Sequence, residues 1–188
     1  MKNKSVKQVT FVAMYTALAV ILELLSRVIP SLPQGGSIEL GLIPVFIASY
    51  HLGFSKGLLV GALWWLVGLI TGGNNYYLTF LQYCFDYIIP FCICGIASLF
   101  PRIKKISNLY TGIVGTMILK YFSHVLSGVF FFAEYGPEGS ATGNAIAWGY
   151  SLSYNLSYNL VTMIICLIVV PILVNRLSKN GEKFIGVK

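Results

Sequence analysis

Long apolar runs separated by short polar segments make up most of the chain. They cover residues 8–29, 40–50, 57–70, 78–100, 112–132 and 148–174 and predict six helices. The longer runs reach the roughly 20 residues that a helix needs to cross a bilayer, and the two shorter runs predict tilted or bent spans. The pattern therefore predicts an all-α integral membrane protein with six transmembrane helices, built as a single domain over residues 1–188.

The composition supports a membrane protein, and the charges predict its orientation. Only 10% of the residues are charged and the mean hydropathy is +0.77, whereas a soluble domain carries about 25% charged residues. Lysine and arginine cluster at residues 2–7, 56, 102–105 and 176–188, at alternate ends of the apolar runs. The opposite loops carry Glu39, Glu134 and Glu138. The positive-inside rule then predicts a multi-pass protein of the cell membrane with both termini in the cytoplasm. The net charge of +7 indicates this topology rather than nucleic-acid binding.

Neither the cysteines nor the glycines form a motif for a cofactor. Cys92-x-Cys94 lacks the second pair or the histidines of a zinc site, so the cysteines are interpreted as small apolar residues. Gly35-Gly36 and Gly72-Gly73 are not followed by the lysine of a nucleotide-binding loop. We expect no metal and no cofactor, and an ATP-driven role would require partner subunits.

The run over residues 112–132 contains Lys120 and His124, which share one face of a helix because they are four residues apart. Ionisable side chains at this depth are costly and usually face a bundle interior or a cavity. The alternative is that Lys120 extends towards an interface. The sequence favours a buried functional site.

Further polar residues lie at the same predicted level. Asp86 lies inside the fourth run, and Tyr150, Tyr154 and Asn155 lie in the last. A pair between Asp86 and Lys120 would lower the cost of burying both. For Glu23 and Arg27, at i and i+4 near the outer end of the first run, a local ion pair is expected.

Aromatic residues surround this group, and with a carboxylate they suit a flat, positively charged ligand. The alternative is the interfacial aromatic belt of any membrane protein. A belt explains Tyr76, Tyr77 and Trp148 equally well, but it does not explain Asp86.

At these residues the sequence resembles the thiamine-specific substrate-binding (S) component of energy-coupling factor vitamin transporters. The most specific segments are Leu119-Lys-Tyr-Phe-Ser-His124 with Gly128 and Phe130-Phe131-Phe132, Tyr150-Ser-Leu-Ser-Tyr-Asn155, and Phe85-Asp86-Tyr87 before Pro90. Weaker support comes from Glu39-Leu-Gly-Leu-Ile-Pro44 and Ala13-x-x-x-Ala17. The resemblance extends over nearly the whole chain.

The resemblance implies an S-component fold of six helices in which the first outer loop closes over thiamine. It implies that Asp86 recognises the aminopyrimidine ring of thiamine, with Tyr87 beside Asp86. It also implies ligand contacts for the aromatic and polar residues His124, Tyr150, Asn155, Phe132, Tyr76 and Lys120. Ala13 and Ala17 would dock on a transmembrane coupling subunit, which two ATPase subunits drive.

The chain departs from the family pattern at three places. Asp86 replaces a glutamate, Phe132 replaces a stacking residue that is often tryptophan, and Gly35-Gly36 stands where some relatives have a tryptophan lid. Because of these departures, the sequence is also consistent with a precursor or an analogue of thiamine as the ligand. Two further hypotheses are a stand-alone carrier coupled to protons through Asp86 or His124, and an intramembrane enzyme using the same residues. The enzyme is disfavoured because no nucleophile or metal motif accompanies them.

Overall fold

The computed structural model describes residues 2–33, 35–71 and 76–188. The elements in chain order are α1 (Lys2–Ser26), α2 (Leu42–Leu52), α3 (Phe54–Ile70), α4 (Phe80–Tyr83), η1 (Cys84–Ile88), α5 (Ile89–Ile93), η2 (Cys94–Leu99), α6 (Asn108–Phe131), η3 (Ala133–Tyr135) and α7 (Ala145–Lys179). Because α4, η1, α5 and η2 follow one another without a break, they form one helical segment. The prediction of an all-α membrane protein with six helical segments is confirmed for the described part of the chain.

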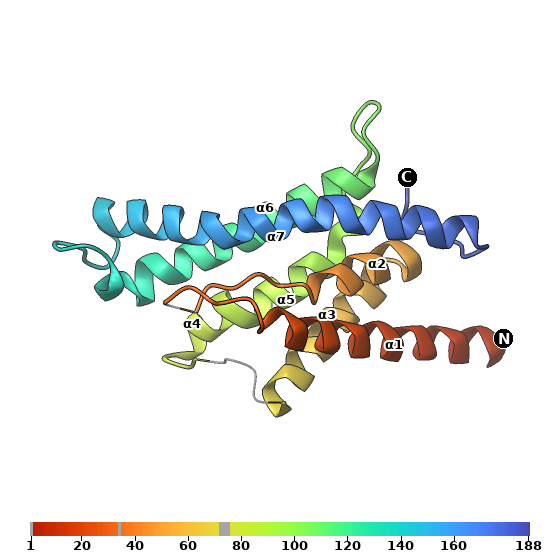
Figure 1. Cartoon of the computed structure of the whole chain (residues 1–188), viewed down its shortest axis with the longest axis horizontal. Helices are drawn as coiled ribbons and strands as arrows, with labels where there is room; N and C mark the ends of the chain where they lie inside the picture. Colours follow the sequence, from red (N-terminus) through yellow and green to blue (C-terminus); the bar gives the residue numbers. More distant parts are fainter. Residues whose placement is uncertain (1, 34, 72–75) are drawn as a thin grey trace.

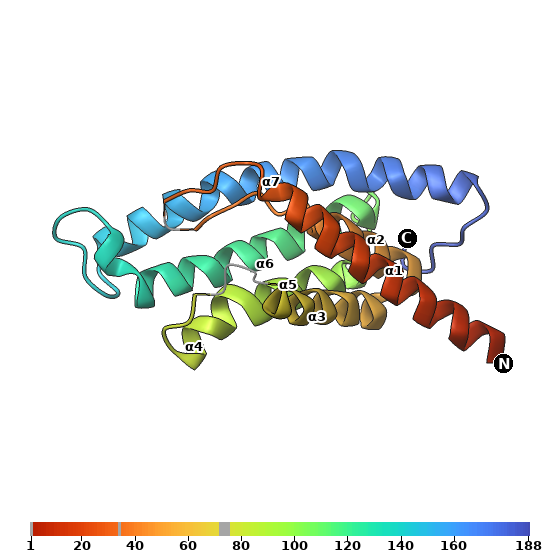
Figure 2. The ribbon, with the colours of Figure 1, turned by 60° about the horizontal axis from the view of Figure 1, so that its bottom comes forward.

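Four of the segments are long and apolar enough to cross a membrane: Val6–Ser26, Phe80–Leu99, Asn108–Phe131 and Ala145–Lys179. In Figures 1 and 2, α6 and α7 lie side by side, and α1 packs on α2 and α3. Residues 72–75 of the predicted outer segment 71–77, which include Gly72-Gly73, lie outside the described residues.

The short helix α2 is a core element. Its residues 42–51 are all buried, against α1, α3, η2 and α7. A helix that is apolar on every face is stable only when neighbours cover it. This explains why a run of 11 residues suffices here.

Close packing of α3 on the fourth segment depends on glycine. A Cβ atom on Gly57 would lie 2.3 Å from the Gly95 carbonyl oxygen, and one on Gly61 would lie 2.2 Å from the Phe91 carbonyl oxygen. Small residues let helix backbones approach closely in a membrane. Gly57 and Gly61, four residues apart, thus form the close-packing face of α3.

The first helix ends earlier than the sequence predicts. It ends at Ser26, whereas the apolar run continues to residue 29. The Ser26 hydroxyl donates to the Leu22 carbonyl (2.9 Å) and accepts from the Leu40 amide (3.0 Å). This side chain thus joins the end of α1 to the start of α2, and loop 31–39 runs between them.

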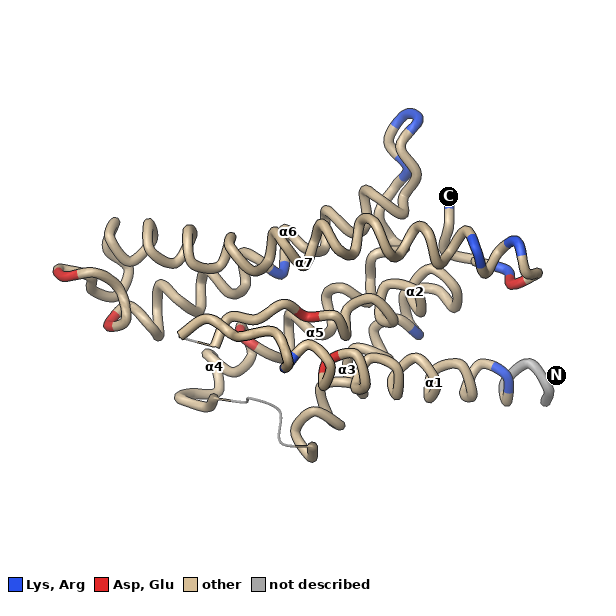
Figure 3. The backbone as a smooth tube through the Cα atoms, in the orientation of Figure 1, with Lys and Arg blue, Asp and Glu red and all other residues tan. Residues whose placement is uncertain are grey.

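Most basic residues lie towards one end of the long axis of the molecule. Figure 3 shows lysine and arginine at the end that holds both termini and in the loop between η2 and α6. Acidic residues lie in the loop between α6 and α7, at the opposite end, and an acidic position also lies at the end with the termini; both acidic and basic residues lie in the middle of the bundle. By the positive-inside rule the termini lie in the cytoplasm, which stays a prediction.

Candidate ligand-binding site

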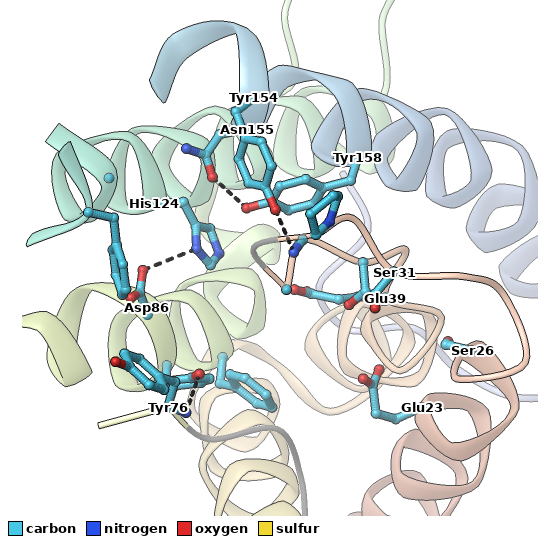
Figure 4. A pocket seen from close by; sticks show the side chains of 18 of the residues that line it. Glu23, Ser26, Ser31, Glu39, Tyr76, Asp86, His124, Tyr154, Asn155 and Tyr158 are labelled. Carbon is cyan, nitrogen blue, oxygen red and sulfur yellow. Dashed lines mark hydrogen bonds and ion pairs between the residues drawn. The ribbon is translucent and has the colours of Figure 1, made fainter. Parts of the chain in front are cut away.

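A cavity of about 880 Å³ lies among α1, loop 31–39, α3, η1, α6 and α7. Figure 4 shows polar side chains from these elements around it. Binding pockets for small molecules commonly have volumes of about 300–1,000 Å³. Of the side chains predicted to contact a ligand, those that line it are Tyr76, Asp86, Tyr87, His124, Phe132, Tyr150 and Asn155.

Asp86 is held by two neighbours. Gln82, which is fully buried, donates from Nε2 to Asp86 Oδ2 at 2.6 Å. His124 Nδ1 lies 3.6 Å from Asp86 Oδ1, as Figure 4 shows. Both side chains of this pair retain slight exposure, 11% for His124 and 17% for Asp86. The buried His124 Nε2 atom has no hydrogen-bond partner among the described residues, so it is available to a ligand.

A π-helical turn places Asp86 and Tyr87 on the cavity wall. In η1 the Ile89 amide donates to the Cys84 carbonyl, five residues back. In this register Phe85 would need a donor at residue 90, and Pro90 has no N–H. The Ser123 hydroxyl of α6 donates to the Phe85 carbonyl instead, at 2.6 Å. Turns of this type often occur at functional sites.

Lys120 does not pair with Asp86, so that prediction is wrong. Its Nζ lies 3.1 Å from Glu39 Oε2 and donates to Asn159 Oδ1 at 3.0 Å. Lys120 is 1% exposed and is absent from the described lining of the cavity, whereas Glu39 is a lining residue. Lys120 thus lies behind the wall and joins loop 31–39 to α6 and α7.

A stripe of tyrosines on α7 forms one wall. Tyr150, Tyr154 and Tyr158 are spaced at i, i+4 and i+8, so they share a helix face. Their neighbouring ring centroids lie 5.8 and 6.0 Å apart. The Tyr158 hydroxyl donates to Asn155 Oδ1 at 2.5 Å, and Asn155 Nδ2 donates to the Ser151 carbonyl at 2.9 Å. This network holds Asn155 in one orientation.

The described residues of loop 31–39, which are 31–33 and 35–39, cover part of the cavity, and Gly36 packs on this stripe. The Gly36 amide donates to the Tyr154 hydroxyl at 2.9 Å. A Cβ atom on Gly36 would lie 2.6 Å from the Tyr158 ring, and Gly35 has a φ of +91°. Gly36 thus permits a close approach of backbone to ring, and Gly35 adopts a conformation that favours glycine.

Aromatic side chains from the residues before α4 and after α6 form another part of the wall. The Tyr76 and Phe132 rings lie 6.0 Å apart, and Phe132 and Tyr135 lie 6.1 Å apart. The Tyr76 backbone amide donates to the Tyr87 hydroxyl at 2.8 Å. Their arrangement gives a planar ligand ring faces to stack against.

The lining residues that were not predicted to contact a ligand include Glu23, Arg27, Glu39, Trp64, Trp65 and Tyr158. The four-residue period of the α7 tyrosines was a signal for Tyr158. For Glu23, the signal was an acidic residue inside the apolar run 8–29. The expected Glu23–Arg27 pair is wrong, because no ion pair within 4.0 Å joins them among the described ion pairs.

The helices and the cavity together define a multi-pass membrane protein with an internal cavity of a size suited to a small molecule. The family described as "Thiamine transporter protein (Thia_YuaJ)" matches residues 9–181, and the chain belongs to this family. The resemblance seen in the sequence is thereby confirmed at the family level, and the role is transport rather than catalysis.

Individual relatives agree. The chain is 33% identical over 162 residues to the thiamine transporter ThiT of Bacillus subtilis, covering 80% of this chain and 81% of the relative. It is 28% identical over 156 residues to ThiT of Lacticaseibacillus paracasei, covering 75% of each. A solved structure of ThiT from Listeria monocytogenes superposes with a TM-score of 0.71 at 24% identity, covering 94% of this chain and 97% of that one. This last match establishes the fold.

Proposed function

We propose that the chain is the substrate-binding (S) component of an energy-coupling factor importer and binds thiamine in the cavity. The observation that carries the proposal is Asp86, which lies on the cavity wall between Gln82 and His124 among aromatic rings. A carboxylate with one oxygen already bonded can accept a charge-assisted hydrogen bond from an aminopyrimidine. The surrounding rings suit its flat heterocycles.

The remaining lining residues complete the proposed site. Phe132 and Tyr76 would stack on the ligand, and Tyr87, Tyr150 and Asn155 would border it. His124 would donate or accept at the buried Nε2 atom, which lacks a partner among the described residues. Lys120 would act indirectly, because it holds Glu39 in place on the loop that covers the cavity.

Docking on the coupling subunit is proposed for the outward side of α1. Ala13 and Ala17 are exposed there, whereas Val12, Tyr15 and Ala19 face the core. Small residues on an outward face allow another helix to approach closely. The coupling subunit and its two ATPase subunits are the expected partners, and the cavity would open towards the outside of the cell.

The site is tested by titrating thiamine into the detergent-purified chain while following tryptophan fluorescence. Asp86→Asn keeps the shape and removes the charge, and we expect the affinity to fall about tenfold or more, since hydrogen bonds to charged groups contribute roughly 1.5–3 kcal/mol. The exposed Glu138→Gln is the matched control. An Asp86→Asn variant with wild-type affinity would contradict the assignment.

Docking is tested separately, by uptake into liposomes that also contain the coupling and ATPase subunits. Ala13→Trp with Ala17→Trp should abolish ATP-dependent uptake and leave thiamine binding unchanged. Leu156→Trp with Leu160→Trp, at the same spacing on the exposed face of α7, is the control.

A stand-alone carrier is the alternative function, because Asp86 faces His124 at 3.6 Å and histidine can change its charge near neutral pH. Thiamine accumulation driven by a pH gradient, in liposomes that hold this chain alone, would support that carrier and contradict the S component.

A further inference from the structure

Glu23 is a cavity-lining carboxylate with one oxygen atom that has no hydrogen-bond partner among the described residues. It lies near the end of α1 and lines the cavity. Its Oε2 atom is buried and makes no hydrogen bond within the described chain. Burying a carboxylate oxygen without a partner is costly, and a buried polar atom of this kind calls for an explanation.

The other acidic residues on the cavity wall are compensated. Asp86 accepts from Gln82 and faces His124, and Glu39 pairs with Lys120. Glu23 forms no ion pair within 4.0 Å with any described cation. Arg27, one turn further along the same helix, is exposed. Glu23 is thus the lining carboxylate whose charge is not already bound by a neighbouring side chain.

We propose that Glu23 supplies the counter-charge for the cationic group of the ligand, and so selects a charged over an uncharged ligand. The inference rests on the proposed function. Thiamine joins a neutral aminopyrimidine to a thiazolium ring with a permanent positive charge. Figure 4 shows Glu23 across the cavity from Asp86, so a ligand whose pyrimidine contacts Asp86 would extend its cationic ring towards α1.

The two ends of the cavity would bind the ligand through different interactions. At Asp86 the carboxylate is oriented by Gln82 to accept a directed hydrogen bond. At Glu23 a thiazolium nitrogen has no hydrogen to donate, so the attraction is Coulombic and increases as solvent is excluded. A carboxylate without an ion-pair partner can supply this attraction, and it does not need to be oriented for a hydrogen bond.

The test compares two ligands on matched variants. Thiamine and its uncharged isostere 3-deazathiamine, in which carbon replaces the quaternary nitrogen, are titrated into the wild-type chain, Glu23→Gln, Glu23→Asp and Glu134→Gln. Glu134 is exposed and lies outside the described lining of the cavity, so it controls for a general change in charge. Melting temperatures of the ligand-free variants report on folding.

In the wild type and Glu134→Gln, we expect thiamine to bind about tenfold or more tightly than 3-deazathiamine, a ratio equivalent to about 1.4 kcal/mol. In Glu23→Gln that ratio should fall to near one, through weaker thiamine binding alone. Glu23→Asp keeps the charge and should retain most of the ratio.

A Glu23→Gln variant that still prefers thiamine by the wild-type ratio would overturn the inference. Equal weakening of both ligands would do the same, since it would indicate damage to the cavity. A wild-type chain that binds neither ligand would refute the proposed function itself, so the two failures are distinguishable.

Discussion

Lys120→Met removes the cation of a buried ion pair and leaves Glu39 without its partner. Lys120 is 1% exposed and Glu39 is 16% exposed, with 3.1 Å between Nζ and Oε2. Methionine matches the length of the lysine stem and keeps the packing. We therefore expect the loss of stability to come from the unpaired carboxylate rather than from a cavity.

The magnitude follows from the geometry. At an effective dielectric constant of about 20, two unit charges at this separation attract by roughly 5 kcal/mol. Removing one partner of a buried pair costs about 3–5 kcal/mol, and the residual exposure of Glu39 favours the lower limit. For a chain of this length, about 3 kcal/mol corresponds to a fall in melting temperature of roughly 6–12 °C.

The assay is thermal unfolding of the ligand-free protein in detergent, for Lys120→Met, Glu39→Gln and the double variant. We expect each single variant to be destabilised and the double variant to regain most of the loss, because it buries no charge at this pair. Lys105→Met, at an exposed lysine, is the control. A Lys120→Met variant as stable as the wild type would refute the reasoning, and so would a double variant whose loss equals the sum of the single losses.

Two further substitutions test the walls of the cavity. Gly36→Ala should weaken thiamine binding, because its Cβ would lie 2.6 Å from the buried Tyr158 ring; isothermal calorimetry measures this, with Gly149→Ala, where a Cβ meets nothing within 4 Å, as control. Unchanged affinity would show that the loop is not held against α7. Ser123→Ala should lower the melting temperature, since it leaves a carbonyl of the π-helical turn unpaired at a cost of about 1–3 kcal/mol. Ser157→Ala removes a comparable bond at an exposed site, and an equal loss there would contradict the special role of Ser123.

The hydrophobic pattern was sufficient to predict the helical segments. In a bilayer, unpaired backbone N–H and C=O groups are costly. A long apolar run therefore forms a helix, in which these groups pair within the segment. Ionisable residues inside such runs are rare and face the interior, which is why Asp86 and His124 were identifiable as candidates before their neighbours were known. The tyrosine stripe on α7 follows from the same argument, because a fixed helical period decides which residues share a face.

The pairings within the site required the tertiary structure. Lys120 bonds Glu39 rather than Asp86 because helix rotation and the path of loop 31–39 decide which carboxylate comes within reach. The π-helical turn depends on Ser123, a residue of another helix, as the donor that Pro90 lacks. The uncompensated carboxylate of Glu23 is likewise a property of what surrounds it. Local sequence determines which residues lie at membrane depth, but contacts between side chains a few ångströms apart depend on how whole helices pack, and those positions are set by the sum of many distant contacts.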